Sequence, residues 1–233
     1  MAEEKHILFA ADNHYDTHAG KILFQHIAPY YHIRFCEDDW SCFNEEDLAN
    51  HYSLVMLNLI SDSCGIPTPG PAAEKQMRAY VQAGGALFLL HGASAAFWQW
   101  DWWRAIAGYR WVRENDPDGC TPSRHPIRPF TVAVAKCRHR LCRKLQEVRI
   151  PMDEMYIGLE QTRPAMTLME TTTDEGIFPM CYETTTQWGG RIVGYLPGHA
   201  PDVVQIPENV ANCRTLIDYL LSGHACEIDT CAG

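Results

Sequence analysis

Residues 84–100 read GGALFLLHGASAAFWQW, and this stretch decides the fold. The run ALFLL at 86–90 is short and continuously apolar, which is typical of a parallel strand buried on both faces. The glycine pair before it ends an amphipathic segment that starts at Pro71, a residue suited to the first turn of a helix. A polar exit, His91 and Gly92, follows the strand directly. A helix that leads into a buried strand is the repeating unit of an α/β fold.

The same alternation of short apolar runs and amphipathic segments extends over the rest of the chain. Further strands are predicted at residues 6–11, 31–36, 53–59, 130–135, 147–151, 165–170, 180–184 and 191–196. Helices are predicted at residues 20–27, 71–83, 94–107 and 210–221. No repeat and no linker rich in Gly, Pro or Ser divides the sequence. We therefore expect a single α/β domain over residues 1–233, with its core at about 6–222 and a mostly parallel central sheet.

The composition argues against several classes of function. The formal net charge is −10 and the pI is about 5.5. The densest basic stretch, KCRHRLCRK at residues 136–144, is short, so we expect a solvated helix face or a local anion contact there and no nucleic-acid partner. No run of 18 apolar residues occurs, so no membrane span is expected. The N-terminus lacks the pattern of a secretory signal, and we expect a cytoplasmic location.

The ten cysteines contain no C-x-x-C pair. The closest pairs in the sequence are Cys36/Cys42, Cys137/Cys142 and Cys226/Cys231. A zinc ribbon or finger needs tighter pairs. We interpret the cysteines as small buried apolar residues together with some exposed thiols, of which the last pair could oxidise in air. The core is large enough that folding needs no disulfide.

Polar side chains follow several predicted strands at the points where these strands end. They are Asp12, Asn13 and His14 after the first strand, Asn58 and Ser61 at the third, His91 after the fourth and His199 after the last. In an open parallel sheet, ligands bind outside the carboxyl ends of the strands. His91 and His199 also lie beside glycines, where a backbone can come close to a ligand. We expect these groups to gather at one edge of the sheet.

Four tryptophans lie within six residues, at Trp98, Trp100, Trp102 and Trp103. A single helix cannot bury all of them on one face. We expect Phe97 and two tryptophans to pack on the sheet while the others cover an interface, which favours a homo-oligomer. The alternative is that an exposed ring stacks on a sugar.

Three segments resemble the ThuA-like (trehalose-utilisation) family in order and spacing. They are GGALFLLHGASAAFWQW at 84–100, HRLCRKLQEVRIPMDEMY at 139–156 and GGRIVGYLPGH at 189–199. The first is similar to a glycine pair, an apolar strand and His-Gly-Ala; the second ends in Asp-Glu-x-Tyr; the third is a Gly-Arg strand followed by Gly-His. The resemblance implies a three-layer, flavodoxin-like sandwich of the class I glutamine amidotransferase superfamily. The Gly-Lys-Gly-Arg turn of the commoner members reads Trp188-Gly-Gly-Arg191 here.

Amidotransferases of that superfamily carry a nucleophilic cysteine at the turn between strand and helix. Here this elbow reads Leu90-His91-Gly92-Ala93, so glutamine hydrolysis is not expected. The resemblance implies instead a role in the use of trehalose and other disaccharides. We therefore expect acid–base chemistry on a small-molecule sugar or keto-sugar.

Chemistry beside a ketone needs a base that takes a C–H proton and an electrophile that holds the enolate oxygen. His91 or His199 is the candidate base, with Asp153 or Glu154 as acid or orienting partner. A divalent metal such as Zn or Mn, with His14, His91 and His199 as ligands, is the candidate electrophile. The candidate substrate contacts are Asp12, Asn13, Asn58, Trp98 and Tyr156.

Two other interpretations stay open. The chain could be a sugar-binding module without turnover that uses the same residues, or an assembly subunit whose aromatic segment forms an oligomer interface. Asp153 and Glu154 could also be a hydrogen-bonded turn that anchors a loop. Fold alone does not decide between these possibilities. The convergence of the histidines with Asp153 and Glu154 is the discriminating feature.

Overall fold

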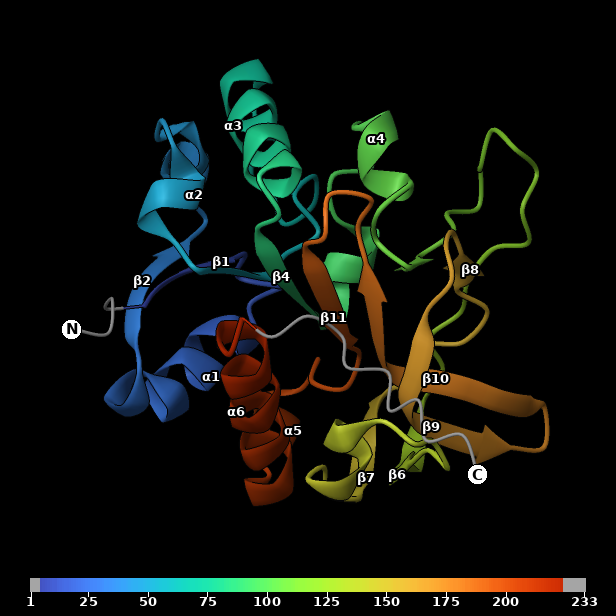
Figure 1. Ribbon diagram of the computed structural model, residues 1–233. Coiled ribbons are helices and arrows are strands. Elements are labelled where there is room, and N and C mark those ends of the chain that lie inside the picture. The colour runs from blue at the N-terminus through green and yellow to red at the C-terminus, as the bar shows by residue number, and fades with distance from the viewer. Residues whose placement is uncertain (1–4, 224–233) are drawn as a thin grey trace, which may run out of the picture.

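The computed structural model describes residues 5–223, and its centre is a nine-stranded sheet (Figure 1). From edge to edge the strands follow the order β2-β1-β3-β4-β11-β10-β9-β6-β7. Their bounds are His6–Ala11 (β1), His32–Glu37 (β2), Leu54–Asn58 (β3), Ala86–Leu90 (β4), Ile127–Val134 (β6), Val148–Glu154 (β7), Met166–Thr173 (β9), Gly176–Thr185 (β10) and Arg191–Tyr195 (β11). A separate pair is formed by Tyr109–Arg110 (β5) and Glu160–Gln161 (β8).

Five neighbouring strands, β2, β1, β3, β4 and β11, are parallel to one another. Every residue of β3 and of β11 is buried. Strands that are covered on both faces need apolar side chains at nearly every position, which explains the continuous apolar runs in the sequence. The carboxyl ends of these five strands meet at one edge of the sheet.

Helices cover both faces of the parallel strands, which gives three layers (Figure 1). The α-helices are Ala19–Ile27 (α1), Leu48–His51 (α2), Pro71–Gln82 (α3), Asp101–Arg104 (α4), Pro201–Val204 (α5) and Pro207–Leu221 (α6). The 3-10 helices are Ala28–Tyr30 (η1), Trp40–Asn44 (η2), His91–Ala95 (η3) and Arg140–Arg143 (η4). The molecule has two hydrophobic cores, and neighbouring residues of β1 belong to different ones. Phe9 packs in one core with residues of α1 and α6, and Leu8 packs in the other with residues of α3. The predicted α/β class is confirmed.

The other four strands, β10, β9, β6 and β7, extend the sheet in antiparallel fashion. A register shift near Cys181 interrupts the ladder between β9 and β10, and such irregularities bend a sheet. Val148 and Ile150 of β7 share one apolar cluster with Phe9 of β1 and Tyr195 of β11. This half of the sheet therefore curls back, and the carboxyl end of β7 comes close to the loop that follows β11.

The prediction of a continuous helix over residues 94–107 is wrong. The chain turns at Phe97, whose φ of 50° lies outside the helical region, and only Asp101–Arg104 is α-helical. Phe97 stacks on Trp100 with 4.0 Å between ring centroids. Phe97, Trp100 and Trp103 are buried, as predicted for Phe97 and two tryptophans. Burial of these three rings thus accompanies a turn of the chain at Phe97 in place of a continuous helix.

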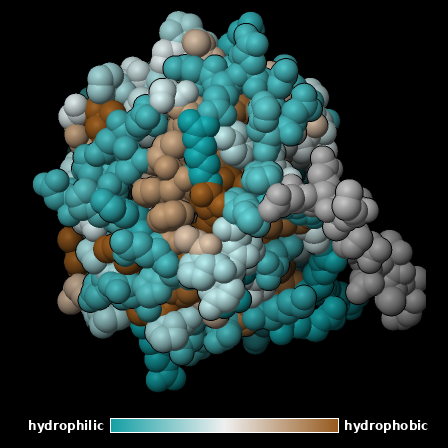
Figure 2. Space-filling model, turned by 90° about the vertical axis from the view of Figure 1, so that its left-hand side faces the viewer, coloured by the Kyte–Doolittle hydropathy of each residue, from teal (hydrophilic) through white to brown (hydrophobic). Residues whose placement is uncertain are grey.

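The edge strand β2 runs along the face of the molecule shown in Figure 2. Hydrophobic residues gather in the middle of this face, between hydrophilic ones (Figure 2). Phe35 of β2 is partly buried and stacks on Phe24 of α1, with 4.6 Å between the ring centroids. Arg34, between Ile33 and Phe35, is exposed. A charged side chain on an edge strand discourages pairing with another sheet.

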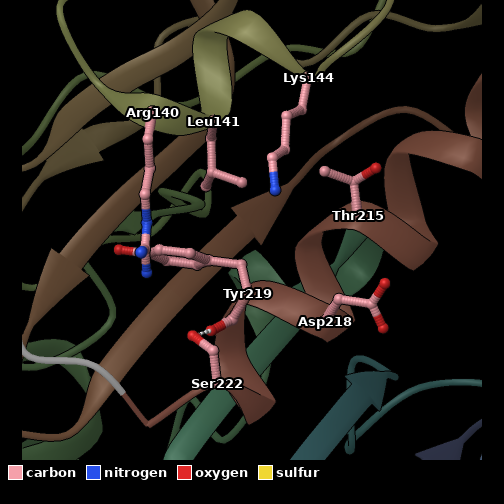
Figure 3. Close-up of a pocket in the computed structure, with 7 residues that line it drawn as sticks. All are labelled: Arg140, Leu141, Lys144, Thr215, Asp218, Tyr219 and Ser222. Carbon is pink, nitrogen blue, oxygen red and sulfur yellow. Dashed lines mark hydrogen bonds between the residues drawn. The ribbon is translucent and has the colours of Figure 1, made fainter.

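The basic stretch at residues 136–144 contains only the short 3-10 helix η4 and no longer α-helix. η4 packs against the C-terminal end of α6 and leaves a pocket of about 220 Å³ (Figure 3). Arg140 lies over the ring of Tyr219 at 4.8 Å, and Lys144 extends toward the pocket (Figure 3). None of the predicted site residues lines this pocket.

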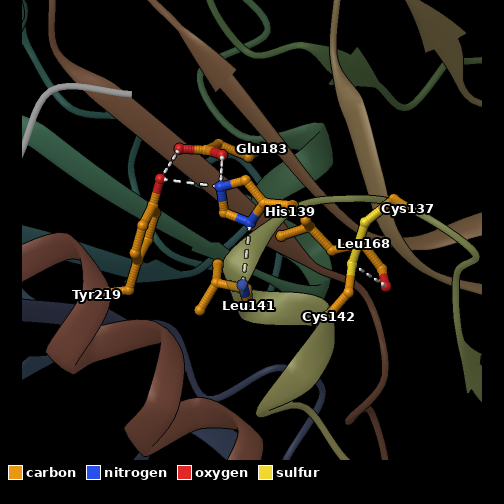
Figure 4. The surroundings of a disulfide bond; sticks show 7 residues. All are labelled: Cys137, His139, Leu141, Cys142, Leu168, Glu183 and Tyr219. Atoms are coloured by element: carbon orange, nitrogen blue, oxygen red, sulfur yellow. Dashed lines mark hydrogen bonds and ion pairs between the residues drawn. A yellow bond between two sulfur atoms is a disulfide. The ribbon is translucent and has the colours of Figure 1, made fainter. Parts of the chain in front are cut away.

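A disulfide joins Cys142 of η4 to Cys137, which lies just before η4 (Figure 4). The interpretation of the cysteines as apolar residues or free thiols is wrong for this pair, because the tight turn of η4 brings two residues together that the sequence separates by five positions. Between them, His139 lies 3.1 Å from the carboxylate of Glu183 (Figure 4). The disulfide therefore closes the segment that presents His139 to β10.

Some predictions fall outside what the structure addresses. The pair Cys226/Cys231 lies outside the described residues. Within residues 5–223, no helix has the length and apolar character needed to cross a membrane. The cytoplasmic location and the homo-oligomer stay predictions.

Candidate functional site

Three histidines from different loops come together at the carboxyl edge of the parallel strands. His14 follows β1, His91 follows β4 and His199 follows β11. The ring centroid of His14 lies 5.0 Å from those of His91 and His199, which are 5.4 Å from each other. One nitrogen from each ring can be chosen so that all three atoms lie within 4.8 Å of one another.

The backbone at two of these histidines adopts a conformation that few non-glycine residues take. φ is 47° at His14 and 40° at His91, both in the left-handed region. Such residues cost free energy and cluster at functional sites. Gly92 permits the close approach of the two loops, because a Cβ at this position would lie 2.8 Å from Cε1 of His14.

The ring nitrogens of the three histidines form a donor set suited to a metal ion. Nδ1 of His91 lies 2.7 Å from the carbonyl oxygen of Leu196, a contact that requires a proton on Nδ1 and leaves Nε2 bare. Within the described part of the chain, Nδ1 of His14 and Nδ1 of His199 are buried without a hydrogen bond. A buried nitrogen without a partner costs free energy unless a ligand satisfies it. Neutral imidazoles are typical ligands of zinc and related transition ions.

Asp153, near the end of β7, holds the loop that carries His199. Its carboxylate is buried and accepts hydrogen bonds from the backbone N–H groups of Gly198, His199 and Ala200, at 2.9, 3.2 and 3.0 Å. All three bonds tie β7 to the turn after β11. This is the anchoring role that the sequence left open for Asp153.

Glu154, the next residue, lies among the histidines. Its Oε2 is 3.4 Å from Nε2 of His91 and 3.6 Å from Nδ1 of His199, and its Oε1 is 3.1 Å from Nδ1 of His125. Burial acts to raise the pKa of Glu154, but the histidines outweigh it and lower this pKa to about 2. Glu154 is therefore ionised at neutral pH.

Tyr156 completes the group on the same side. Its hydroxyl lies 3.2 Å from Nε2 of His91. Burial, and then the negative charges of Glu154 and Asp153, raise the pKa of Tyr156 well above its ordinary value. Burial, together with the neighbouring histidines, lowers the pKa of His199, although Glu154 opposes this shift. At neutral pH the site therefore combines a protonated phenol, a carboxylate and a neutral His199.

His14, Glu154 and Tyr156 line a pocket of about 380 Å³, a size suited to a small molecule, whereas His91, His199 and Asp153 do not line it. The lining residues are His14, Tyr15, Ile60, Asp62, Ser63, Ala95, Trp111, Arg113, His125, Glu154 and Tyr156. The lining thus combines aromatic and polar side chains, with His14, Glu154 and Tyr156 as the reactive groups among them.

Two of the predicted substrate contacts are buried beneath the pocket and do not line it. Asp12 Oδ2 accepts the backbone N–H of Ile60 at 2.7 Å, and its Oδ1 lies 3.3 Å from Nδ1 of His14. The backbone carbonyl of Asn58 accepts the N–H of Asp12 at 3.1 Å. Asp12 and Asn58 therefore position the loops on which His14 and Ile60 lie.

The other two predicted substrate contacts, Asn13 and Trp98, interact with other side chains of the protein and do not line the pocket. Asn13 donates its backbone N–H and its side-chain amide to Asp38, at 2.7 and 3.0 Å. The guanidinium groups of Arg110 and Arg113 lie over the ring of Trp98 at 4.5 and 4.7 Å. Of the five residues predicted to bind substrate, Tyr156 is the one that the pocket includes.

Several pocket residues were not predicted from the sequence, among them Asp62, Trp111, Arg113 and His125. Trp111, Arg113 and His125 come from a polar, turn-rich segment that ends no strand of the parallel half. The rule that ligands bind at strand ends therefore could not find them. Asp62 follows Ser61 directly after β3, and this position did give a usable signal.

Comparison with known proteins places the chain in a family. The family model for ThuA, described as trehalose utilisation, matches residues 7–219. No curated protein matches the chain. A ThuA-like protein from Parabacteroides merdae is 17% identical with a TM-score of 0.70, and the match covers 96% of this chain and 92% of that one. A ThuA-like protein from Bacteroides uniformis is 13% identical with a TM-score of 0.72, covering 94% and 92%. At these identities the solved structures support the fold alone, whereas the family model spans almost the whole chain: the chain belongs to the ThuA (trehalose utilisation) family.

Proposed function

We propose that the chain is an enzyme that binds a divalent transition metal through His14, His91 and His199 and performs acid–base chemistry on a sugar or keto-sugar. The observation that carries this proposal is the meeting of the three imidazoles: Nδ1 of His14 and Nδ1 of His199 make no hydrogen bond, and Nε2 of His91 is the ring nitrogen that does not contact Leu196. Such an ion, when bound, supplies positive charge that stabilises an oxyanion.

Glu154 is the base in this proposal. It is ionised at neutral pH, faces the pocket and lies beside two of the metal ligands. A substrate that fills the pocket excludes water, and burial raises the pKa of a carboxylate. Binding of the substrate therefore shifts the basicity of Glu154 toward the value that proton abstraction needs.

Tyr156 is the proton donor in this proposal. Its hydroxyl is protonated at neutral pH and faces the same pocket as Glu154. The phenol can donate a hydrogen bond to a developing oxyanion of the substrate. Glu154 and Tyr156 together provide the base and the donor that enolisation of a keto-sugar requires.

Glutamine hydrolysis does not fit this site. The elbow after β4 carries His91, and Nδ1 of its ring contacts the carbonyl oxygen of Leu196. The nearest hydroxyl on the elbow belongs to Ser94, which is buried and donates to the carbonyl oxygen of His91 at 3.2 Å. Ser94 is therefore engaged in holding the turn.

The sugar as substrate is supported by the trehalose utilisation family and by a pocket lined by both aromatic and polar side chains. The test is exchange of the C–H protons beside the ketone of a 3-keto-glucoside in D₂O, followed by NMR. Protein loaded with Zn or Mn is expected to catalyse this exchange. A chelator should lower the rate by at least about tenfold, because the positive charge that stabilises the enolate is removed. No exchange by the loaded protein would leave the sugar-binding module without turnover as the better interpretation.

A further inference from the structure

The pocket wall carries an ion pair that the proposed chemistry does not use. Nη1 of Arg113 donates to Oδ2 of Asp62 at 2.7 Å, and Nη2 of Arg113 donates to Oδ1 of Asp62 at 2.8 Å. Both side chains line the pocket: the side chain of Arg113 is 33% exposed and that of Asp62 is 21% exposed. Two parallel bonds between a guanidinium and a carboxylate form a strong and directional pair.

The orientation of Arg113 is fixed by contacts outside the pocket lining. Its guanidinium lies over the ring of Trp98 at 4.7 Å. The preceding residue, Val112, donates its backbone N–H to Oγ of Ser123 at 2.9 Å and accepts the N–H of Ser123 at the same distance. Stacking on an aromatic face and an anchored backbone fix the orientation of the guanidinium. Trp98 thus supports the pocket wall from outside the pocket.

The loop that carries Asp62 is anchored as well. Its neighbour Ser61 is buried, and Oγ of Ser61 accepts the backbone N–H of Phe97 at 2.9 Å. The loop after β3 is therefore tied to the turn after η3. The ion pair joins two anchored segments, so a ligand meets it already organised and little rotamer freedom is lost on binding.

The pair presents neighbouring donors and acceptors to the pocket. Each carboxylate oxygen of Asp62 uses one of its lone pairs on Arg113, and each Nη keeps a second N–H. Two adjacent hydroxyls can donate to such a carboxylate and accept from such a guanidinium. The aromatic rings of Trp111 and Tyr156 also line the pocket, and they suit the apolar C–H face of a sugar ring.

The pair is also neutral as a whole. Among the described residues that line this pocket, Arg113 is the one that carries a permanent positive charge, and Asp62 cancels it. A carboxylate or phosphate that contacts this pair would lose water without gaining an unpaired cation from the pair, which is unfavourable.

We propose that Asp62 and Arg113 together bind adjacent hydroxyls of an uncharged sugar, and that Asp62, by neutralising Arg113, excludes acidic and phosphorylated sugars. This inference rests on the proposed function, since it concerns the substrate of the same pocket. It makes Asp62 and Arg113 specificity-determining residues and Trp98 their support.

Asp62→Asn tests the inference with two probes that differ in one group, methyl α-glucoside and methyl α-glucuronide. Binding to the metal-loaded full-length protein is measured by calorimetry. The wild type is expected to prefer the glucoside. In the variant, we expect the affinity for the glucoside to fall about tenfold and that for the glucuronide to rise about tenfold, because Arg113 is left with an unpaired charge. Glu147→Gln, an exposed carboxylate outside the pocket lining, is the matched control and should bind both probes like the wild type.

The outcomes separate this inference from the proposed function. Equal affinities for the glucoside in wild type and Asp62→Asn, or a wild type that prefers the glucuronide, overturn the inference and leave the proposed function standing. A wild type that binds metal but neither probe overturns the inference and the sugar substrate together. A gain of glucuronide binding in the variant supports the inference and cannot result from misfolding. Loss of both probes from a variant that keeps its metal contradicts the charge argument.

Discussion

Glu154→Gln is expected to lower the rate of proton exchange on a keto-glucoside by about 10²–10⁴-fold, the usual contribution of a positioned general base. Glutamine keeps the shape of the side chain but has no basic oxygen of comparable strength. The rate is measured by NMR in D₂O on protein loaded with Zn or Mn. Because the proposed ligands are His14, His91 and His199, the variant should still bind metal.

The control for this experiment is Glu147→Gln, at the opposite end of β7 from Glu154, where the carboxylate is half exposed. Its exchange rate should equal that of the wild type. If Glu154→Gln retains the full exchange rate and its metal, another group in the pocket is the base. His125, which contacts Glu154 and faces the pocket, would then be the first to replace.

Asp153→Ala is expected to lower the free energy of unfolding by about 2–5 kcal/mol, because three backbone N–H groups lose a charged acceptor. Urea unfolding of the metal-free protein measures this change without a contribution from the metal. Asp202→Ala, in the exposed first turn of α5, should change stability by less than about 0.5 kcal/mol.

This pair of variants separates the two roles that the sequence allowed for Asp153. A variant as stable as the wild type but without exchange activity would show a catalytic acid. The hydrogen bonds predict the reverse: the free energy of unfolding falls, and activity falls because the loop that carries His199 moves.

Much of the fold follows from the sequence because buried parallel strands need uninterrupted apolar runs. β4 lies at 86–90 as predicted, and the other long strands differ by only a few residues at their ends. The aromatic segment after η3 was mispredicted because side-chain burial and a positive φ at Phe97 outweigh local helix propensity. The short elements α2, α5, β5 and β8 have too few residues for a periodic pattern.

The candidate site was predictable where a side chain follows a parallel strand. His14, His91 and His199 satisfy that rule, and the structure brings them together. The wall formed by Trp111 and His125 depends on the long connection between β4 and β6, whose course no local pattern determines. The surroundings of Trp98 could not be predicted from the sequence, because its ring is covered by two arginines that lie outside the predicted helix.

Metal content tests the central proposal most directly. The purified protein is incubated with Zn or Mn, passed through gel filtration and analysed by mass spectrometry of the elements, together with His14→Ala, His91→Ala and His199→Ala. His26→Ala, an exposed histidine of α1, is the control. We expect about one ion per chain in the wild type and the control, and far less in each of the other three variants. A wild type without metal, or site variants that bind metal as well as the wild type does, would show that these histidines are not a metal site.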